Sequence, residues 1–210
     1  MIFDLDRKIE MPDPKDALTG RDQSLIVSPK HYVNGQDIQG PYPGECKELN
    51  VAMGCFWGAE RFFWQLPGVY STSVGYMGGF TKNATYEDVC SGKTAHTETV
   101  MVVYNQELTD FWTLLESFWI AHNPTQGMKQ GNDVGTQYRS AIFWTDDMQK
   151  MFAEKSMSLY QDNLNKAGMG KITTEIKKAR EFYFAEDAHQ QYLHKKPNGY
   201  CGLSGTGISF

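Results

Sequence analysis

Hydrophobic and polar residues follow two different periods along this chain from about residue 48 onwards. Some segments have the short or alternating apolar pattern of strands, and others have apolar residues at the spacing of amphipathic helices. The predicted strands are residues 48–54, 69–76, 96–104, 139–144 and 171–178, and the predicted helices are residues 56–66, 109–122, 146–167 and 183–194. In the second helix we expect Thr109 as the N-cap and a buried stripe of Phe111, Leu114, Leu115, Phe118 and Trp119.

The order of these elements predicts an α/β (α+β) fold. Strands separated by helices form a layered sheet, and the hairpin-like succession of 69–76 and 96–104 indicates a mixed sheet. We therefore expect a two-layer α/β sandwich in one domain over residues 48–210. Residues 1–47 are rich in Asp, Pro and Gly, which predicts an extended N-terminal arm. Long Gly-rich and polar connections are candidate walls of a site, and they cover residues 77–95, 123–138 and 195–210.

Charge and hydropathy narrow the possible partners. The chain has 210 residues, a net charge of −5 and no Lys/Arg-rich run, so neither nucleic acid nor an anionic membrane surface is indicated. No stretch is apolar over the length of a spanning helix, and the start of the chain lacks the pattern of a secretion signal. We expect a cytoplasmic monomer whose partners are proteins or small molecules.

The cysteine and histidine positions do not indicate a metal site. Cys46, Cys55, Cys90 and Cys201 form no CxxC pair, and thiols in a reducing compartment stay reduced unless chemistry oxidises them. His189 and His194 are five residues apart, which does not align two ligands on one helix face. A hydrolase that pairs Cys55 with a distant histidine stays open, with His96, His122 or His189 as the partner.

Cys55 is the strongest candidate for chemistry because it falls between a predicted strand and a predicted helix. At a helix N-terminus, unpaired backbone N–H groups favour the thiolate and lower the pKa of a cysteine. The alternative is a buried structural thiol. Phe56 and Trp57 follow directly, either as core aromatics or as an apolar cage that suits a methyl or thioether group.

Two further segments carry polar side chains that a site could use. Glu98 alternates with its neighbours on a strand and either faces solvent or points inward, where burial would keep its carboxyl protonated. The Gly-rich loop at residues 126–140 is either a plain connection or a wall of the site. Cys201 lies in a Gly-rich tail, either as an incidental surface thiol or as a resolving cysteine for Cys55.

Together these segments resemble the A-type peptide methionine sulfoxide reductases. The resemblance extends over about residues 48–208 and rests on long motifs in the order of that family. They are the Gly-Cys-Phe-Trp-Gly run at 54–58 and the segments 85–92, 127–139, 185–193 and 199–202. The resemblance implies a ferredoxin-like α/β plait and an enzyme that reduces methionine S-sulfoxide, both free and in oxidised proteins. It implies no bound cofactor, with thioredoxin as the external reductant.

The resemblance also implies a role for each matching residue. Cys55 is the expected nucleophile, Phe56 and Trp57 hold the substrate methyl group, and Cys201 resolves the Cys55 sulfenic acid as a disulfide. The expected partners of the sulfoxide oxygen are Glu98, Tyr86 and Tyr138, and the expected organiser of the pocket floor is Asp133. A protonated Glu98 would make the sulfoxide oxygen a better leaving group.

One position departs from many family members. They carry a further cysteine a few residues after the one matched by Cys201, and here Ser209 stands in its place. We therefore expect the Cys55–Cys201 disulfide to be presented directly to the reductant. The rival interpretations are a thiol peroxidase and a non-catalytic module that binds methionine-rich peptides.

Overall fold

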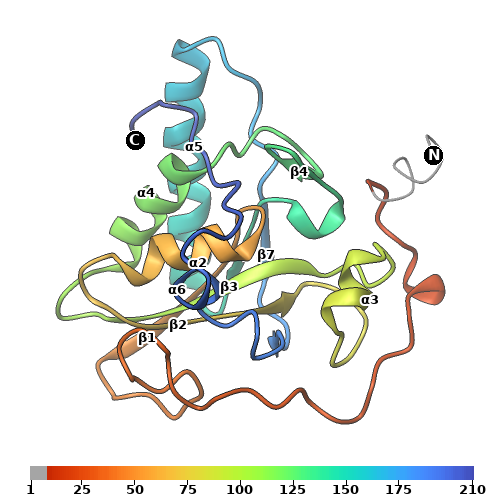
Figure 1. Ribbon diagram of the computed structural model, residues 1–210. Coiled ribbons are helices and arrows are strands. Elements are labelled where there is room, and N and C mark those ends of the chain that lie inside the picture. Colours follow the sequence, from red (N-terminus) through yellow and green to blue (C-terminus); the bar gives the residue numbers. More distant parts are fainter. Residues whose placement is uncertain (1–8) are drawn as a thin grey trace.

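A six-stranded mixed sheet forms the centre of the computed structural model, which describes residues 9–210 (Figure 1). Its strands are β1 (Cys46–Ala52), β2 (Val69–Met77), β3 (Thr97–Asn105), β6 (Ala141–Trp144), β7 (Glu175–Lys178) and β8 (Tyr183–Phe184). They lie in the order β7-β6-β1-β3-β2-β8. The β6–β7 pair is parallel and the other neighbouring pairs are antiparallel. The predicted α/β class with a mixed sheet is confirmed, and the ferredoxin-like plait stays a prediction.

Helices cover one face of this sheet. The α-helices are α2 (Phe56–Trp64), α3 (Tyr86–Cys90), α4 (Phe111–Ala121), α5 (Asp147–Lys166) and α6 (Tyr192–Lys195). The shorter elements are the 3-10 helices η1 (Pro14–Asp16) and η2 (Thr136–Tyr138) and the hairpin strands β4 (Lys129–Gln130) and β5 (Asp133–Val134). In Figure 1, α2, α4 and α5 lie on the same side of the sheet. The apolar side chains of these helices and of the sheet form the main core, whose fully buried members include Leu49, Val51, Phe63, Leu115, Trp119 and Leu164.

The first residue of α4 shows how local hydrogen bonds set a helix boundary. Thr109 is not the N-cap that the sequence predicts, because its N–H closes the preceding turn on the carbonyl of Asn105. The N-cap is Asp110, whose carboxylate accepts the N–H of Thr113 at 2.7 Å. The predicted buried stripe is confirmed, since Phe111, Leu114, Leu115, Phe118 and Trp119 are all buried.

The helix predicted over residues 183–194 is wrong. The first two of these residues form β8, turns follow, and only α6 is helical. Tertiary hydrogen bonds explain the difference, because the side-chain amide of Gln190 pairs with both backbone groups of Val74 in β2, at 3.0 and 2.8 Å. The next residue, Gln191, has left-handed backbone angles with φ 47° and ψ 42°. A continuous helix cannot contain that conformation.

The two ends of the described chain pack against the domain. The N-terminal arm follows the lower rim of the molecule in Figure 1 before it joins β1, and its Ile38 is fully buried. Part of the predicted arm, residues 1–8, lies outside the described residues. After Cys201, the C-terminal tail rises beside α5, where the Phe210 ring stacks on Tyr160 with centroids 6.0 Å apart. Each helix among residues 9–210 is too short or too polar to span a bilayer.

Candidate active site

Cys55 lies in the short connection between β1 and α2. Gly54 makes the turn with φ 96°, and a side chain there would collide with Gln130, because its Cβ would lie 2.6 Å from Cγ. Cys55 is the N-cap residue of α2, as the sequence predicts. Its thiol is half-buried, so it is placed at the helix N-terminus but largely withdrawn from solvent.

The electrostatic environment of Cys55 differs from the sequence expectation. Burial, followed by the proximity of Glu98, raises the pKa of the Cys55 thiol above its usual value, although the backbone N–H of Trp57 acts in the opposite direction. The lowered pKa expected from the helix start is therefore wrong, because burial acts in the opposite direction to the helix N-terminus at this thiol. The physical reason is that loss of hydration disfavours the thiolate more than the first helical N–H groups favour it.

Glu98 projects from β3 towards the first turn of α2. Its carboxyl is only 1% exposed, and its Oε2 accepts the backbone N–H of Phe56 at 3.0 Å. Burial, with a further contribution from Asp133, raises the pKa of Glu98 to about 8. Glu98 is therefore neither a solvated strand residue nor ionised at neutral pH, and it carries a proton beside Cys55.

Aromatic rings form a wall beside this acid. The indole of Trp57 stacks on Tyr192 with centroids 4.0 Å apart, and it donates its N–H to His189 Nδ1 at 3.1 Å. Tyr86 is stacked further along the same wall, 6.5 Å from Trp57. Phe56 belongs to the core and is fully buried, whereas Trp57 keeps exposed surface. Trp57, Tyr86 and Tyr192 each keep part of their surface exposed, so the wall is accessible at more than one ring.

Three more predicted residues gather around Glu98. Tyr86 comes from α3, Tyr138 from η2 and Asp133 from β5. Burial raises the pKa of both Tyr86 and Tyr138, and the Glu98 carboxyl raises each further, so both hydroxyls stay protonated. Burial also raises the pKa of Asp133, whose Oδ2 accepts the hydroxyl of Tyr200 at 3.0 Å. The structure thus brings two hydroxyl donors and a second carboxyl to the acid.

Cys201 approaches the site from the C-terminal tail. Its Sγ lies 2.8 Å from the position that a Cβ at Gly58 would occupy, so the sulfur rests against the first turn of α2. This turn also carries Cys55, and the two thiols interact electrostatically. Cys201 is exposed to solvent, whereas Cys46, Cys55 and Cys90 are each partly buried. Cys46 is at the start of β1, and Cys90 hydrogen-bonds with the Tyr86 hydroxyl.

The chain is similar to known proteins over most of its length. Residues 47–207 match the family described as peptide methionine sulfoxide reductase. The chain belongs to the peptide methionine sulfoxide reductase family. The peptide methionine sulfoxide reductase MsrA of Azotobacter vinelandii is 56% identical over 96% of this chain and 93% of its own. The enzyme of the same name from Rippkaea orientalis is 53% identical over 99% of this chain and 96% of its own.

A solved structure supports the same assignment. Methionine sulfoxide reductase A of Corynebacterium diphtheriae has a TM-score of 0.86 and 44% identity, covering 95% of this chain and 97% of its own. Reduced Mxr1 of Saccharomyces cerevisiae has a TM-score of 0.71 and 34% identity, covering 77% of this chain and 91% of its own. The resemblance to the reductase family is therefore confirmed, and the chain is an oxidoreductase of that family.

Three residues of segment 185–193 lie beside the predicted site residues, although the sequence did not predict them there. They are His189 and Tyr192, which contact Trp57, and Glu186, which accepts the N–H of Tyr86 at 2.8 Å. The motif itself is the signal that could have found them. The other histidines considered for hydrolysis serve the fold, since both ring nitrogens of His96 and of His122 are bound to backbone or hydroxyl groups. Residues 9–210 hold no cluster of three or more His, Cys, Asp or Glu residues suited to a metal ion.

Proposed function

We propose that this protein reduces methionine S-sulfoxide, free and in oxidised proteins, and so repairs oxidised proteins. The observation that carries the proposal is the buried and protonated Glu98 carboxyl beside the Cys55 thiol and the Trp57 wall. A sulfoxide needs a nucleophile for its sulfur, a proton donor for its oxygen and an apolar surface for its methyl group. These three needs correspond to Cys55, Glu98 and Trp57.

The first step transfers the sulfoxide oxygen to Cys55. The sulfur of Cys55 bonds to the sulfoxide sulfur while Glu98 donates its proton to the sulfoxide oxygen, and the thiol proton then passes to the Glu98 carboxylate. The hydroxyl group so formed moves from the substrate sulfur to the Cys55 sulfur as the bond between the two sulfur atoms breaks, and the electron pair returns to the substrate sulfur. The products are methionine and a Cys55 sulfenic acid, so the substrate loses one oxygen and the cysteine gains it. Tyr86 and Tyr138 hold the oxygen through their hydroxyls during this transfer, and Asp133 orders the pocket floor through its bond with Tyr200.

The second step joins Cys55 to Cys201. The Cys201 thiol attacks the sulfenic acid, water leaves, and a disulfide remains. The contact of Cys201 with the first turn of α2 supports this pairing. Ser209 occupies the position of a third redox cysteine, so the disulfide is exchanged directly with a dithiol reductant. We assign that reductant to thioredoxin, as the family resemblance implies. For Mxr1 of Saccharomyces cerevisiae, a structure in complex with Trx2 has been solved.

The substrate pocket takes the methyl group against the Trp57 indole. Phe56 is buried in the core next to this indole, and the centroids of the Phe56 and Trp57 rings are 6.4 Å apart. The pocket is assigned to both a free amino acid and a peptide side chain because the two carry the same methyl sulfoxide group. The proposal extends to a cytoplasmic monomer with a reductase domain over residues 48–210 and no bound cofactor.

A thiol count tests this function. Incubating the reduced protein with one equivalent of a methyl sulfoxide should remove two thiols and release one equivalent of methyl sulfide. Mass spectrometry should then show the Cys55–Cys201 bridge, and a bridge that includes Cys46 or Cys90 would refute the pairing. Hydrogen peroxide serves as the matched oxidant, because a thiol peroxidase would lose its thiols to peroxide and leave the sulfoxide intact. If neither the sulfoxide nor hydrogen peroxide removes any thiols, the protein is a non-catalytic binding module.

A further inference from the structure

The part of the chain that holds Trp57 in place has little regular structure of its own. Residues 185–195, called here the wall segment, carry both His189 and Tyr192, the two residues that contact the indole. The segment has the four-residue helix α6, preceded by turns and by Gln191 in a left-handed conformation. Such a conformation is unfavourable for a residue with a side chain and persists only where its surroundings impose it. The position of the indole therefore depends on what anchors the wall segment.

One anchor lies inside the domain. Glu60 of α2 is fully buried and accepts both the backbone N–H of Gln191 at 2.8 Å and its side-chain amide at 2.6 Å. Gln190 pairs with the backbone of Val74 in β2. These bonds fix the middle of the wall segment to the core. On the outer side of the wall segment, the Lys195 ammonium lies 3.4 Å from Asp187 Oδ2, which ties these two residues to each other but not to the core.

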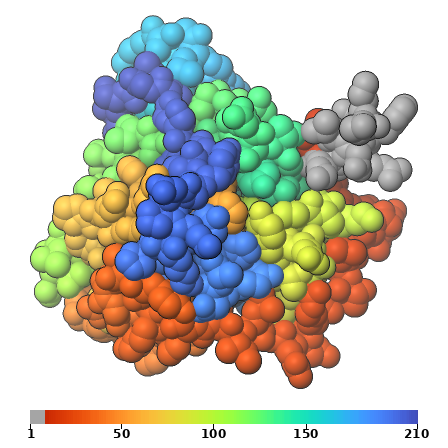
Figure 2. All heavy atoms as spheres, viewed as in Figure 1, coloured from red at the N-terminus to blue at the C-terminus, as the bar shows by residue number. Residues whose placement is uncertain are grey.

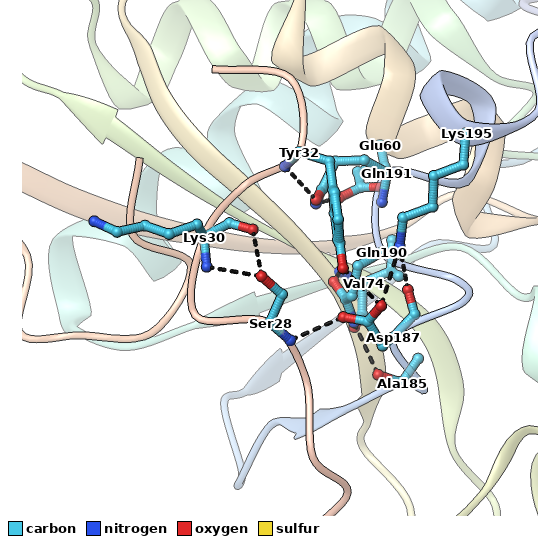
Figure 3. Close-up of polar contacts among 10 residues, drawn as sticks. All are labelled: Ser28, Lys30, Tyr32, Glu60, Val74, Ala185, Asp187, Gln190, Gln191 and Lys195. Atoms are coloured by element: carbon cyan, nitrogen blue, oxygen red, sulfur yellow. Dashed lines mark hydrogen bonds and ion pairs between the residues drawn. The ribbon is translucent and has the colours of Figure 1, made fainter. Parts of the chain in front are cut away.

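The outer side is held by the N-terminal arm (Figure 3). The hydroxyl of Tyr32 donates to Asp187 Oδ2 at 2.8 Å, and the backbone N–H of Ser28 donates to Oδ1 of the same carboxylate at 2.8 Å. The backbone N–H of Tyr32 donates to the side-chain oxygen of Gln191 at 3.1 Å. The Lys195 ammonium lies 3.7 Å from the centre of the Tyr32 ring. Tyr32 thus contacts three residues of the wall segment at once.

The arm can act as an anchor because it is itself tied to the core. His31, next to Tyr32, is buried, with its Nε2 3.0 Å from the hydroxyl of Thr72 and its ring edge-on to Trp64. The hydroxyl of Thr72 in turn donates to Glu60, so the inner and outer anchors meet on one carboxylate. Figure 2 shows the arm and the later part of the chain packed side by side on one face of the molecule.

We propose that the N-terminal arm is a positioning element of the substrate site, and that Tyr32 is its positioning residue. Tyr32 holds the wall segment, the wall segment holds His189 and Tyr192, and these two fix the plane of the Trp57 indole. The arm precedes residues 47–207, which carry the family match, so this role extends the site beyond the reductase motifs. The inference about substrate affinity rests on the proposed function, whereas the inference about the indole does not.

The test compares Tyr32→Ala and Tyr32→Phe with Asn34→Ala. Asn34 is the matched control because its side chain ties the same arm to the carbonyl of Tyr70 and to the backbone N–H of Gln36, both outside the wall segment. We expect Tyr32→Ala to raise KM for methyl sulfoxide about fivefold, the factor that corresponds to one net hydrogen bond, with a smaller change in kcat. Tyr32→Phe keeps the ring over Lys195 and loses only the hydroxyl, so its KM should be intermediate. Asn34→Ala should leave KM unchanged.

A direct readout of Trp57 separates positioning from general loss of stability. The indole N–H of Trp57 gives an NMR signal that is assigned by its loss in Trp57→Phe. In folded Tyr32→Ala or Tyr32→Phe this signal should move, because the bond to His189 changes, and in Asn34→Ala it should stay. In the Trp57→Phe background, Tyr32→Ala should add no further rise in KM.

Two results would overturn the proposal. One is an unmoved indole signal in both Tyr32 variants, and the other is a full Tyr32→Ala effect on KM when Trp57 is already Phe. If Tyr32→Ala does not fold, Tyr32→Phe decides alone. If the unmodified protein does not reduce sulfoxide at all, the proposed function fails while the indole signal still decides whether the arm positions Trp57.

Discussion

Replacing Glu98 with Gln is expected to stabilise the protein while it slows the reaction. Gln has nearly the shape of a protonated Glu, and its side-chain oxygen can still accept the N–H of Phe56. It cannot ionise and cannot transfer a proton readily. The variant therefore removes the acid and keeps the local geometry.

The gain in stability follows from the pKa of Glu98. In the folded protein this pKa is raised from 4.5 to about 8, so at pH 7 the unfolded chain ionises at this position and the folded chain does not. A raised pKa gives full stability below pH 4.5 and loses it as pH rises towards 8. Over the 2.5 units from 4.5 to pH 7 this loss is about 3 kcal/mol, which Glu98→Gln should recover.

The loss of rate follows from the same proton. At pH 7 a carboxyl with a pKa of about 8 is protonated in about nine-tenths of the molecules. Removing that proton donor should slow the formation of the Cys55 sulfenic acid on the order of a hundredfold or more. The rate of the unmodified protein should fall above pH 8 as Glu98 ionises, and the slow rate of the variant should lack that fall.

Urea unfolding at pH 5, 6, 7 and 8 measures the first effect, and single-turnover thiol loss measures the second. The matched control is Glu48→Gln, because burial raises the pKa of Glu48 as well, although it lies on β1 and outside the site. That variant should keep the full rate. A Glu98→Gln protein that is no more stable at pH 8 than at pH 5, relative to the unmodified protein, would refute the assigned protonation. A rate within threefold of normal would remove Glu98 from the acid role.

Three further substitutions test the surroundings of the site. Gly58→Ala places a Cβ against the sulfur of Cys201 and should slow disulfide formation on the order of tenfold while sulfenic acid, trapped by dimedone, accumulates. Tyr160→Phe removes the hydroxyl that binds the C-terminal tail and should lower the free energy of unfolding by about 1 kcal/mol in urea titrations. Arg139→Met leaves the buried carbonyls of Thr136 and Ala95 without their donor, although Glu175 keeps its ion pair with Lys177, and should destabilise by about 1–3 kcal/mol, again measured in urea.

The regular part of the fold can be predicted because its patterns are local. β3 has an apolar run over residues 100–104 and β2 is rich in β-branched and aromatic residues, and both strands follow the predicted ranges closely. The start of α2 at Cys55 follows from the change of period there. Because side chains alternate between the two faces of β3, the sequence left two alternatives for the Glu98 carboxyl, one facing solvent and one facing inward. Burial then had to be supplied by the fold, because it depends on α2 and on the loop that carries Asp133.

The helix predicted over residues 183–194 shows where local patterns stop being sufficient. The sequence there has helix-like spacing, but Gln190 and Gln191 find stronger partners on Val74 and Glu60, which precede them by more than a hundred residues. The same contacts create the wall segment that holds Trp57. The N-terminal arm is similar, because its composition predicts an extended chain but not the bond between Tyr32 and Asp187. In both places the residues that the sequence leaves unexplained are those that position the site.

The protonation of Cys55 is the point at which structure most changes the chemistry. A helix N-terminus favours an anion by about 0.3–1 kcal/mol in exposed positions, and withdrawal from water opposes the anion more strongly at a buried one. Burial raises the pKa of both Cys55 and Glu98, which favours the protonated form of each group in the free protein. In the proposed reaction, one of these protons goes to the sulfoxide oxygen and the other replaces it on Glu98. The N–H groups of α2 then stabilise the negative charge that develops on the Cys55 sulfur during its attack on the sulfoxide. They do not stabilise a thiolate already present in the free protein.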